Sequence, residues 1–177
     1  MNHWEERGPS GWRLGLSIAL LLAIGLLGCS RTNDSQLSNA SDTPETAVQR
    51  MLDALAVSDT VAMHSLRMSR YEHDSILVPQ MPIGQADSGS TDLGYAWFLL
   101  EQNNIKGIRR AISDYGGQRF RVTKVRFTRP DQRYGSVTLH KGTEVSVRDS
   151  GGQESVLPIF GSIIEQGGRF KIVSVRD

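Results

Sequence analysis

The densest group of side chains able to exchange protons or bind a metal lies at Tyr71-Glu72-His73-Asp74. A phenol, an imidazole and two carboxylates could serve as general acid, general base or metal ligands. Adjacent residues on a helix point in different directions, however, and the spacing from His73 to a second ligand that a metal site needs is missing. The pattern therefore favours a solvated helix surface over a catalytic or metal-binding centre.

Motifs of the familiar enzyme classes are missing from the sequence. It has no Gly-x-Ser-x-Gly nucleophile turn, no glycine-rich phosphate loop, no paired cysteines and no His-Glu-x-x-His zinc motif. The sequence thus predicts no catalytic residues, no metal site and no cofactor, although an unfamiliar kind of site stays open.

The only cysteine, Cys29, follows a segment with the three parts of an export signal. Arg7 and Arg13 precede the apolar run 14–27, which is shorter than the about 20 residues of a permanent membrane span. Leu26-Leu27-Gly28-Cys29 resembles the bacterial lipobox. That resemblance implies signal cleavage between Gly28 and Cys29 and attachment of a diacylglycerol and a further acyl chain to Cys29. The alternative is an uncleaved signal anchor.

A lipid anchor on Cys29 would determine where the protein resides. Stable attachment needs more than one acyl chain, because each buried CH₂ contributes about 0.8 kcal/mol. We therefore expect a protein of the cell envelope whose partner is the membrane. In the lipoproteins that the motif resembles, an Asp after the cysteine marks retention at the inner membrane, so Ser30 favours the outer membrane in a cell with two membranes.

The 177 residues, 38% of them hydrophobic and with a net charge of +1, allow one compact domain plus tails. The predicted organisation is a signal peptide over residues 1–28, a disordered polar tether over 29–43 and a folded domain over 44–177.

The folded domain is expected to begin with helices. Thr43 can cap a helix whose first residue is Pro44. Apolar residues then recur on one face of this helix at Val48, Met51, Leu52 and Leu55. A second helical pattern covers 92–115, where Asn103-Asn104 and Gly107 predict one kinked helix or two joined helices.

From Phe120 onward the apolar period changes to two, which predicts an antiparallel meander of about four strands. The alternation changes phase near Thr123-Lys124, which predicts a bulge. Residues 137–147 fit one long bent strand, with a tight turn at Lys141-Gly142 as the alternative. A third strand is expected over 156–164 and a fourth over 170–175. Helices packed on a curved antiparallel sheet place the domain in the α+β class.

Both ends of the folded domain resemble NTF2-like (cystatin-like, SnoaL-like) domains. Pro44-Glu45-Thr46-Ala47-Val48 is similar to their first helix. Gly168-Arg169-Phe170-Lys171-Ile172 is similar to their closing Gly-x-Trp-Lys-Ile strand, with Phe170 where Trp is common. The resemblance implies a cone in which a curved sheet wraps around helices and forms a pocket, and a homodimer through the open sheet face. Fold alone does not imply catalysis.

Enzymes of that family place Asp, His or Tyr side chains inside an apolar cavity to move protons. The residues of these types here form no diagnostic pair, and they are His64, Tyr71, His73, Asp74, Asp114, Tyr115, His140 and Glu165. The candidates for lining a pocket are Trp97, Phe98, Tyr71 and Tyr115, although Trp97 and Phe98 are more simply explained as core residues. His140 alternates with Leu139 and is expected to face away from the helices.

Basic residues concentrate between positions 106 and 133, where nine of them accompany Asp114 and Asp131. They are Lys106, Arg109, Arg110, Arg119, Arg121, Lys124, Arg126, Arg129 and Arg133. Such a stretch could meet anionic lipid headgroups, surface polysaccharide or an acidic partner. The simpler explanation is a solvated face whose charges discourage edge-to-edge aggregation. Nucleic acid is not an expected partner of an exported protein, and no aromatic residues interleave the charges for base stacking.

Two classes of function follow. The favoured one is an envelope lipoprotein whose small domain binds an envelope protein or a small apolar ligand without catalysing a reaction. The alternative is a small pocket enzyme of the ketosteroid isomerase type. Unpaired Asp, Glu or His side chains pointing into an open cavity would favour the enzyme, whereas a pocket closed by apolar side chains would favour binding.

Overall fold

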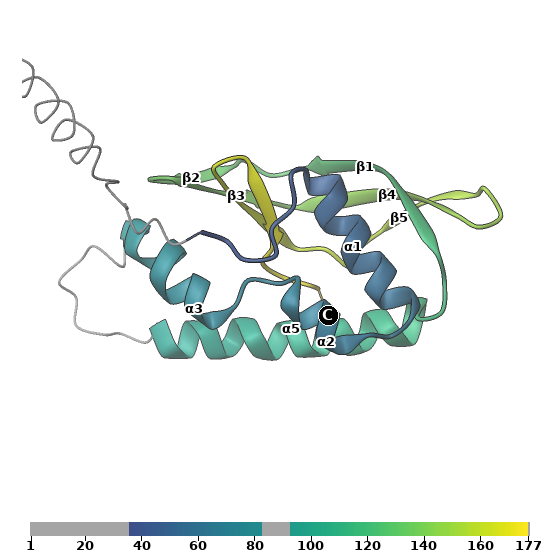
Figure 1. Cartoon of the computed structure of the whole chain (residues 1–177), viewed down its shortest axis with the longest axis horizontal. Helices are drawn as coiled ribbons and strands as arrows, with labels where there is room; N and C mark the ends of the chain where they lie inside the picture. The colour runs from purple at the N-terminus through teal and green to yellow at the C-terminus, as the bar shows by residue number, and fades with distance from the viewer. Residues whose placement is uncertain (1–35, 83–92, 177) are drawn as a thin grey trace, which may run out of the picture. The chain divides into compact units, whose positions relative to one another are not determined.

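The computed structural model describes residues 36–82 and 93–176. The helices are α1 (Pro44–Ala56), α2 (Thr60–Ser65), α3 (Arg70–Glu72), the π-helix η1 (His73–Leu77), the 3₁₀-helix η2 (Val78–Gln80) and α5 (Leu93–Tyr115). The strands are β1 (Phe120–Phe127), β2 (Gln132–Tyr134), β3 (Val137–Lys141), β4 (Thr143–Asp149), β5 (Glu154–Leu157), β6 (Ser162–Gln166) and β7 (Arg169–Ile172). Helices first and antiparallel strands afterwards confirm the predicted α+β class (Figure 1).

The strands form two antiparallel sheets, one with the order β1-β4-β5 and the other with the order β2-β3-β6-β7. The described residues thus contain seven strands where the sequence predicted about four, because the apolar segments change sheet along their length. The segment 137–147 passes from β3 into β4 at Gly142, whose φ of +69° lies in the left-handed region that glycine adopts without strain. The alternative of a tight hairpin at Gly142 is wrong, since β3 and β4 lie in different sheets.

The predicted third strand over 156–164 is wrong, because residues 158–161 interrupt it. Pro158 has no N–H to donate to a ladder, and Gly161 sits so close to Ser174 that a side chain would meet the Ser174 hydroxyl. Before the interruption β5 pairs with β4, and after it β6 pairs with β3 and β7.

Backbone hydrogen bonds connect the points at which the chain changes sheet. Thr128 N–H donates to Gly142 O over 3.1 Å, Thr143 N–H to Gly161 O over 3.2 Å, and Gly161 N–H to Ser174 O over 2.9 Å. The predicted bulge is confirmed, since the β1–β4 register shifts between Val122 and Lys124. This shift keeps apolar residues of both halves of β1 against the main core.

The first two helices begin at side-chain caps. The Thr43 hydroxyl accepts a hydrogen bond from Thr46 N–H over 3.0 Å, and Pro44 occupies the first turn, where a missing N–H costs nothing. Asp59 caps α2 by accepting from Ala62 N–H over 2.9 Å. The predicted apolar face of α1 is buried in the main hydrophobic cluster, which confirms the helix and its orientation.

Helix α5 is one continuous helix, so the alternative of two joined helices is wrong. Its polar middle residue, Asn104, is buried and holds the C-terminal segment with its side chain. The amide donates to Val173 O over 3.1 Å and accepts from Val175 N–H over 2.7 Å. A side chain at Gly107 would approach Val175 O and Arg176 O to 2.6 Å, so only glycine allows this close packing.

The domain begins before the predicted boundary at residue 43. Leu37 and Ala40 are buried in the second hydrophobic cluster, and Ser41 exchanges both backbone hydrogen bonds with Phe170, at 2.9 and 2.7 Å. Two apolar residues in a polar stretch and an added strand-like bridge are therefore enough to order residues 36–43. The predicted signal peptide at residues 1–28 and Cys29 lie outside the described residues.

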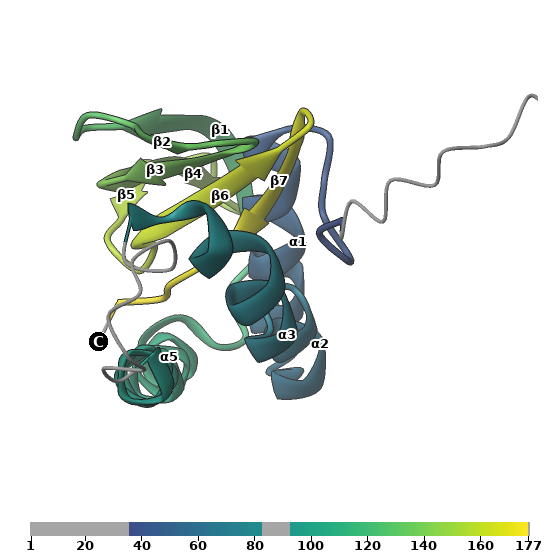
Figure 2. The ribbon, with the colours of Figure 1, turned by 90° about the vertical axis from the view of Figure 1, so that its left-hand side faces the viewer.

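Two clusters of buried side chains form the core. The larger joins α1 and the inner sides of both sheets, and the smaller joins residues of η1 to Leu37, Val137, Ile164 and Val173. Figure 2 shows the strands on one side of the domain, α5 on the opposite side and α1 to α3 along one flank.

Candidate binding groove

An open groove of about 790 Å³ runs where α1 lies beside the start of β1 and the turn between β4 and β5. Residues from these three elements line it, namely Glu45, Thr46, Gln49, Arg50, Asp53, Arg119, Phe120, Arg121, Val122, Arg148, Asp149 and Ser150. The residues come from three distant parts of the sequence, so the groove exists only in the folded chain.

Side chains of α1 fix this helix against β1. In its sheet β1 pairs only with β4, which leaves the backbone groups of its other edge without a strand partner. Gln49 donates to Phe120 O over 2.9 Å and accepts from Val122 N–H over 2.8 Å, and Glu45 accepts from Val125 N–H over 3.2 Å. The edge of β1 is thereby satisfied along its first half, and the groove wall is held in place.

Four arginines face three carboxylates in the groove, but the carboxylates are already engaged. Glu45 accepts from Val125 N–H, Asp53 from the Gln49 amide over 2.9 Å, and Asp149 from Gln153 N–H over 2.9 Å. These contacts position the acids against the protein's own donors. The acids keep their negative charge, so four arginines against three carboxylates leave the groove with an excess of one positive charge.

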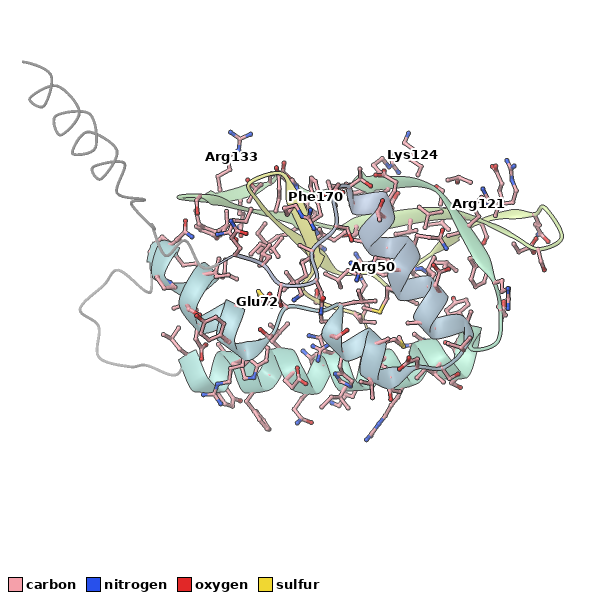
Figure 3. The ribbon with its side chains drawn as sticks, in the orientation of Figure 1. Arg50, Glu72, Arg121, Lys124, Arg133 and Phe170 are labelled. Carbon is pink, nitrogen blue, oxygen red and sulfur yellow. The ribbon has the colours of Figure 1, made fainter. Side chains whose placement is uncertain are left out.

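Two of the four arginines have fixed partners. Arg50 donates to Asn39 O over 2.9 Å, and Arg148 pairs with Glu154 over 2.6 Å. Arg119 and Arg121 are exposed, and neither forms a salt bridge within the described part of the chain. Figure 3 shows Arg121 and Lys124 on β1 and Arg133 on β2 extending from the side of the sheets that faces away from α5.

Arg121 and Arg148 stand directly opposite each other in the β1–β4 ladder. Side chains at such positions are about 5 Å apart at Cβ, and like charges there are destabilising by a few tenths of a kcal/mol. Further along the same face Lys124 stands opposite Ser146, and Arg126 stands opposite Glu144, with which it forms a salt bridge. Glu154 compensates the charge of Arg148, so the charge of this pair that lacks a salt-bridge partner among the described residues is that of Arg121, which could bind an anion.

The cluster Tyr71-Glu72-His73-Asp74 is not the solvated surface that the sequence favoured. Tyr71 is 70% exposed, but Glu72 and His73 are buried. Lys171 Nζ lies 2.8 Å from each carboxylate oxygen of Glu72, and Ser38 and Ser69 also donate to this carboxylate. Burial alone would raise the pKa of Glu72, but the hydrogen bonds from Lys171, Ser69 and Ser38 outweigh it and hold that pKa below its ordinary value.

His73 completes this region without exposing a reactive group. Its Nδ1 lies 2.7 Å from Asp74 Oδ1, and its ring stands 5.2 Å from the ring of Trp97. The hydrogen bond from His73, aided by Arg70, lowers the pKa of Asp74. These contacts join η1 to α5 and are explained by structure alone.

His140 is buried, and both of its ring nitrogens have carboxylate partners. Nδ1 lies 2.8 Å from Asp131 Oδ1, and Nε2 lies 3.1 Å from Glu165 Oε2. The ring stacks on Phe127 with centroids 4.3 Å apart and planes 13° from parallel. His140 lines neither the groove beside α1 nor the cavities that contain Asp114 and Gly161.

The four predicted pocket residues do not come together. Tyr71 and Phe98 are exposed, so the core assignment of Phe98 is wrong, and Trp97 is half-buried beside His73. Tyr115 packs against Phe120 with ring centroids 6.2 Å apart and lines a separate cavity of about 180 Å³ with Asp114.

His64 belongs to another internal group. Its Nδ1 lies 2.8 Å from Nη2 of buried Arg67, which also pairs with Glu101 over 2.9 Å. A guanidinium only donates, so Nδ1 of His64 accepts from Arg67. Partial burial and the Arg67 charge lower the pKa of His64. Within residues 36–82 and 93–176 no group of three or more His, Cys, Asp or Glu side chains could hold a metal ion.

Sequence reasoning found only part of the groove. The basic stretch predicted a positive surface that includes Arg119 and Arg121. No sequence pattern indicated that Gln49, Arg50 and Arg148 would lie beside them. Arg148 could have been found only by pairing β1 with β4 in the correct register, which requires the bulge to be placed first.

The fold and the groove define an α+β domain with an arginine-lined surface site. Comparison with protein-family models, with curated proteins and with solved structures gives no match to this chain. None of the helices in the described residues is long and apolar enough to cross a membrane.

Proposed function

We propose that this protein is an envelope lipoprotein, anchored through Cys29, whose NTF2-like domain binds an acidic segment of a partner protein in the groove between α1 and β1. The observation that carries the binding site is the pair Arg121 and Arg148, which face each other across two strands with Arg119 beside them. Arginine is the side chain best suited to carboxylate recognition, because its fork donates two parallel hydrogen bonds.

The anchor rests on the resemblance of residues 26–29 to the lipobox. The NTF2-like assignment rests on the opening helix and on the meander that follows. The hydrogen bonds at Thr128, Gly142, Gly161 and Ser174 support it, because they make the two sheets continuous around a bend, as in a curved sheet that wraps helices.

The composition of the groove favours a polypeptide over a uniformly anionic polymer. Arginines alternate with carboxylates, with Gln49 and with apolar parts of Phe120 and Val122. A peptide offers acidic, amide and apolar groups together, whereas a polyanion would be repelled by Glu45, Asp53 and Asp149.

Binding is favoured over proton-transfer catalysis by the state of the buried titratable groups. Among the described residues Glu72 is paired with Lys171, His73 with Asp74, and His140 with Asp131 and Glu165. A general base needs a lone pair that can reach the substrate, and these groups instead form hydrogen bonds or ion pairs with neighbouring side chains.

The groove is tested with the lipidated protein in detergent and a fluorescein-labelled peptide that alternates glutamate with leucine and glutamine, followed by anisotropy. We expect binding that weakens with salt and falls about tenfold in Arg119→Ala/Arg121→Ala, which corresponds to two lost charge-assisted contacts. The matched control is Lys106→Ala/Arg109→Ala, which removes two exposed cations of α5. Equal losses in both variants, or no binding at all, would contradict the groove.

The anchor is tested separately by intact mass and membrane partition, with Cys29→Ser beside the wild type. Loss of the leader with a lipid-sized mass gain, abolished by the substitution, is the expected result. An uncleaved chain without added mass would contradict the anchor and leave the groove measurement unaffected.

A further inference from the structure

We propose that the exposed aromatic face of α5, formed by Tyr95, Phe98 and Leu99, rests on the surface of the anionic bilayer that holds the lipid anchor. This inference rests on the proposed lipidation of Cys29. Tyr95 and Phe98 are each 53% exposed and Leu99 is 43% exposed. They stand at positions i, i+3 and i+4, which lie on one side of a helix, and the rings of Tyr95 and Phe98 stack with centroids 6.4 Å apart.

The same side of α5 continues into cations. Lys106 and Arg109 follow at further steps of three and four residues, both are exposed, and neither has a salt-bridge partner in the described ranges. Aromatic and leucine side chains followed by free Lys and Arg are the composition of helices that lie in a membrane interface. The cations suit anionic headgroups, which attract Lys and Arg close to the surface.

The exposure of these side chains is not a result of a loosely placed helix. The opposite side of α5 is fixed by Asn104, which binds Val173 and Val175, and by the close contact at Gly107. Leu100 also packs against the second hydrophobic cluster. Rotating α5 to bury Phe98 would break these contacts, so the apolar side is left for an external surface.

The length of the chain brings this face within reach of the anchor. Leu37 and Leu100 pack on the same hydrophobic cluster, and Leu37 comes only eight positions after Cys29. Even fully extended, a chain of eight residue steps spans at most about 29 Å. The start of β1, which lines the groove, lies at the other end of the long axis from the start of α5 (Figure 1). A bilayer against α5 therefore leaves the groove open to a partner.

A tryptophan on the exposed side of α5 provides a direct measurement. The sequence has three tryptophans, at positions 4, 12 and 97, so processing at Cys29 leaves Trp97 as the only one. Trp97 lies beside His73 and away from the aromatic face, so the reporter protein carries Trp97→Phe/Gln102→Trp, which places the indole four residues after Phe98 on the same side of the helix. The processed reporter protein is reconstituted into vesicles of phosphatidylethanolamine and phosphatidylglycerol with brominated acyl chains, which quench indole fluorescence at short range. We expect quenching that falls by about half or more when Tyr95→Ser/Phe98→Ser/Leu99→Ser is added.

The matched control is Val57→Ser/Val61→Ser/Val156→Ser, which removes three exposed apolar side chains from other elements and should keep the quenching. Replacing phosphatidylglycerol by phosphatidylcholine should reduce it through Lys106 and Arg109. No quenching when the α5 face is intact, or an equal loss in the control, would overturn the proposal. A protein that is a dimer and becomes a monomer only in the α5 variant would also overturn it, because the face would then be a contact between two copies of the chain.

Failure of the anchor is visible independently in the intact mass. In that case the same proteins are sedimented with phosphatidylglycerol vesicles, and the α5 variant should bind about fivefold less than the control. Equal sedimentation of the two would overturn the α5 contact.

Discussion

Lys171 and Glu72 form a salt bridge in which both side chains are almost fully buried, with exposed fractions of 1% and 2%. The pair joins β7 to α3. A further hydrogen bond from Ser38 to Glu72 brings in the segment before α1, and one from Ser69 comes from the cap of α3. Every oxygen of the carboxylate is therefore used. Such a pair contributes less to stability than its Coulomb attraction suggests, but removing one partner is costly because the other charge stays buried.

We expect Lys171→Met to lower the free energy of unfolding by about 3 kcal/mol, because it leaves the Glu72 carboxylate buried without its cation. Urea denaturation at neutral pH measures this. The control is Arg126→Met, which breaks the exposed salt bridge with Glu144 and should cost less than about 1 kcal/mol. Similar losses in the two variants would mean that burial does not determine the cost.

The same pair predicts how stability depends on pH. Burial raises and hydrogen bonds lower the pKa of Glu72, with a net result below its ordinary value of 4.5. A carboxylate whose folded pKa is depressed binds protons more readily in the unfolded chain, so its contribution is complete above about pH 4.5 and is lost as pH falls through the folded pKa.

Glu72→Gln should therefore be clearly less stable than the wild type at pH 7, and the difference should shrink at pH 3. Denaturation of both proteins at the two pH values measures the difference, and repeating it at high salt should change it little because the pair is buried. A difference that is the same at pH 3 and pH 7 would exclude Glu72 as the source.

Local patterns predicted the elements whose signals lie close together in the sequence. The cap at Thr43-Pro44, the apolar face of α1 and the bulge between Val122 and Lys124 are each determined within a few residues. Glu72 and His73 could not be assigned in this way. The partner that makes burial of Glu72 tolerable is Lys171, which is 99 positions away in the sequence.

Elsewhere tertiary contacts overrode local propensity. The sequence predicted that Asn104 and Gly107 weaken the helix. In the structure both residues contact the C-terminal segment, Asn104 through its side chain and Gly107 through its close approach. The predicted strand over 156–164 failed because its apolar pattern does not record that β5 and β6 belong to different sheets. The groove could not be predicted from local sequence patterns either, because its walls come from three separate segments of the chain.

The contact at Gly107 can be tested with two glycines of the same helix. Gly107→Ala should lower the free energy of unfolding by about 2 kcal/mol or more, because its Cβ would overlap backbone oxygens that cannot move aside easily. Gly94→Ala meets nothing within 4 Å and should raise stability by up to about 1 kcal/mol through helix propensity. Thermal and urea unfolding of the two variants compare the effects, and a gain in Gly107→Ala would show that α5 does not lie this close to residues 175–176.

The pair Arg121 and Arg148 predicts that stability and binding change in opposite directions. Arg121→Thr removes a like-charge contact and places a good strand former on an exposed position, so the free energy of unfolding should rise by about 0.5 kcal/mol at low salt and less at high salt. Arg126→Thr, further along the same face of β1, should lower the free energy of unfolding because Glu144 loses its partner. Binding of the peptide that alternates glutamate with leucine and glutamine should fall in Arg121→Thr and change little in Arg126→Thr. A loss of stability in Arg121→Thr would mean that the arginine stabilises the sheet, which would remove the main reason to place an anion in the groove.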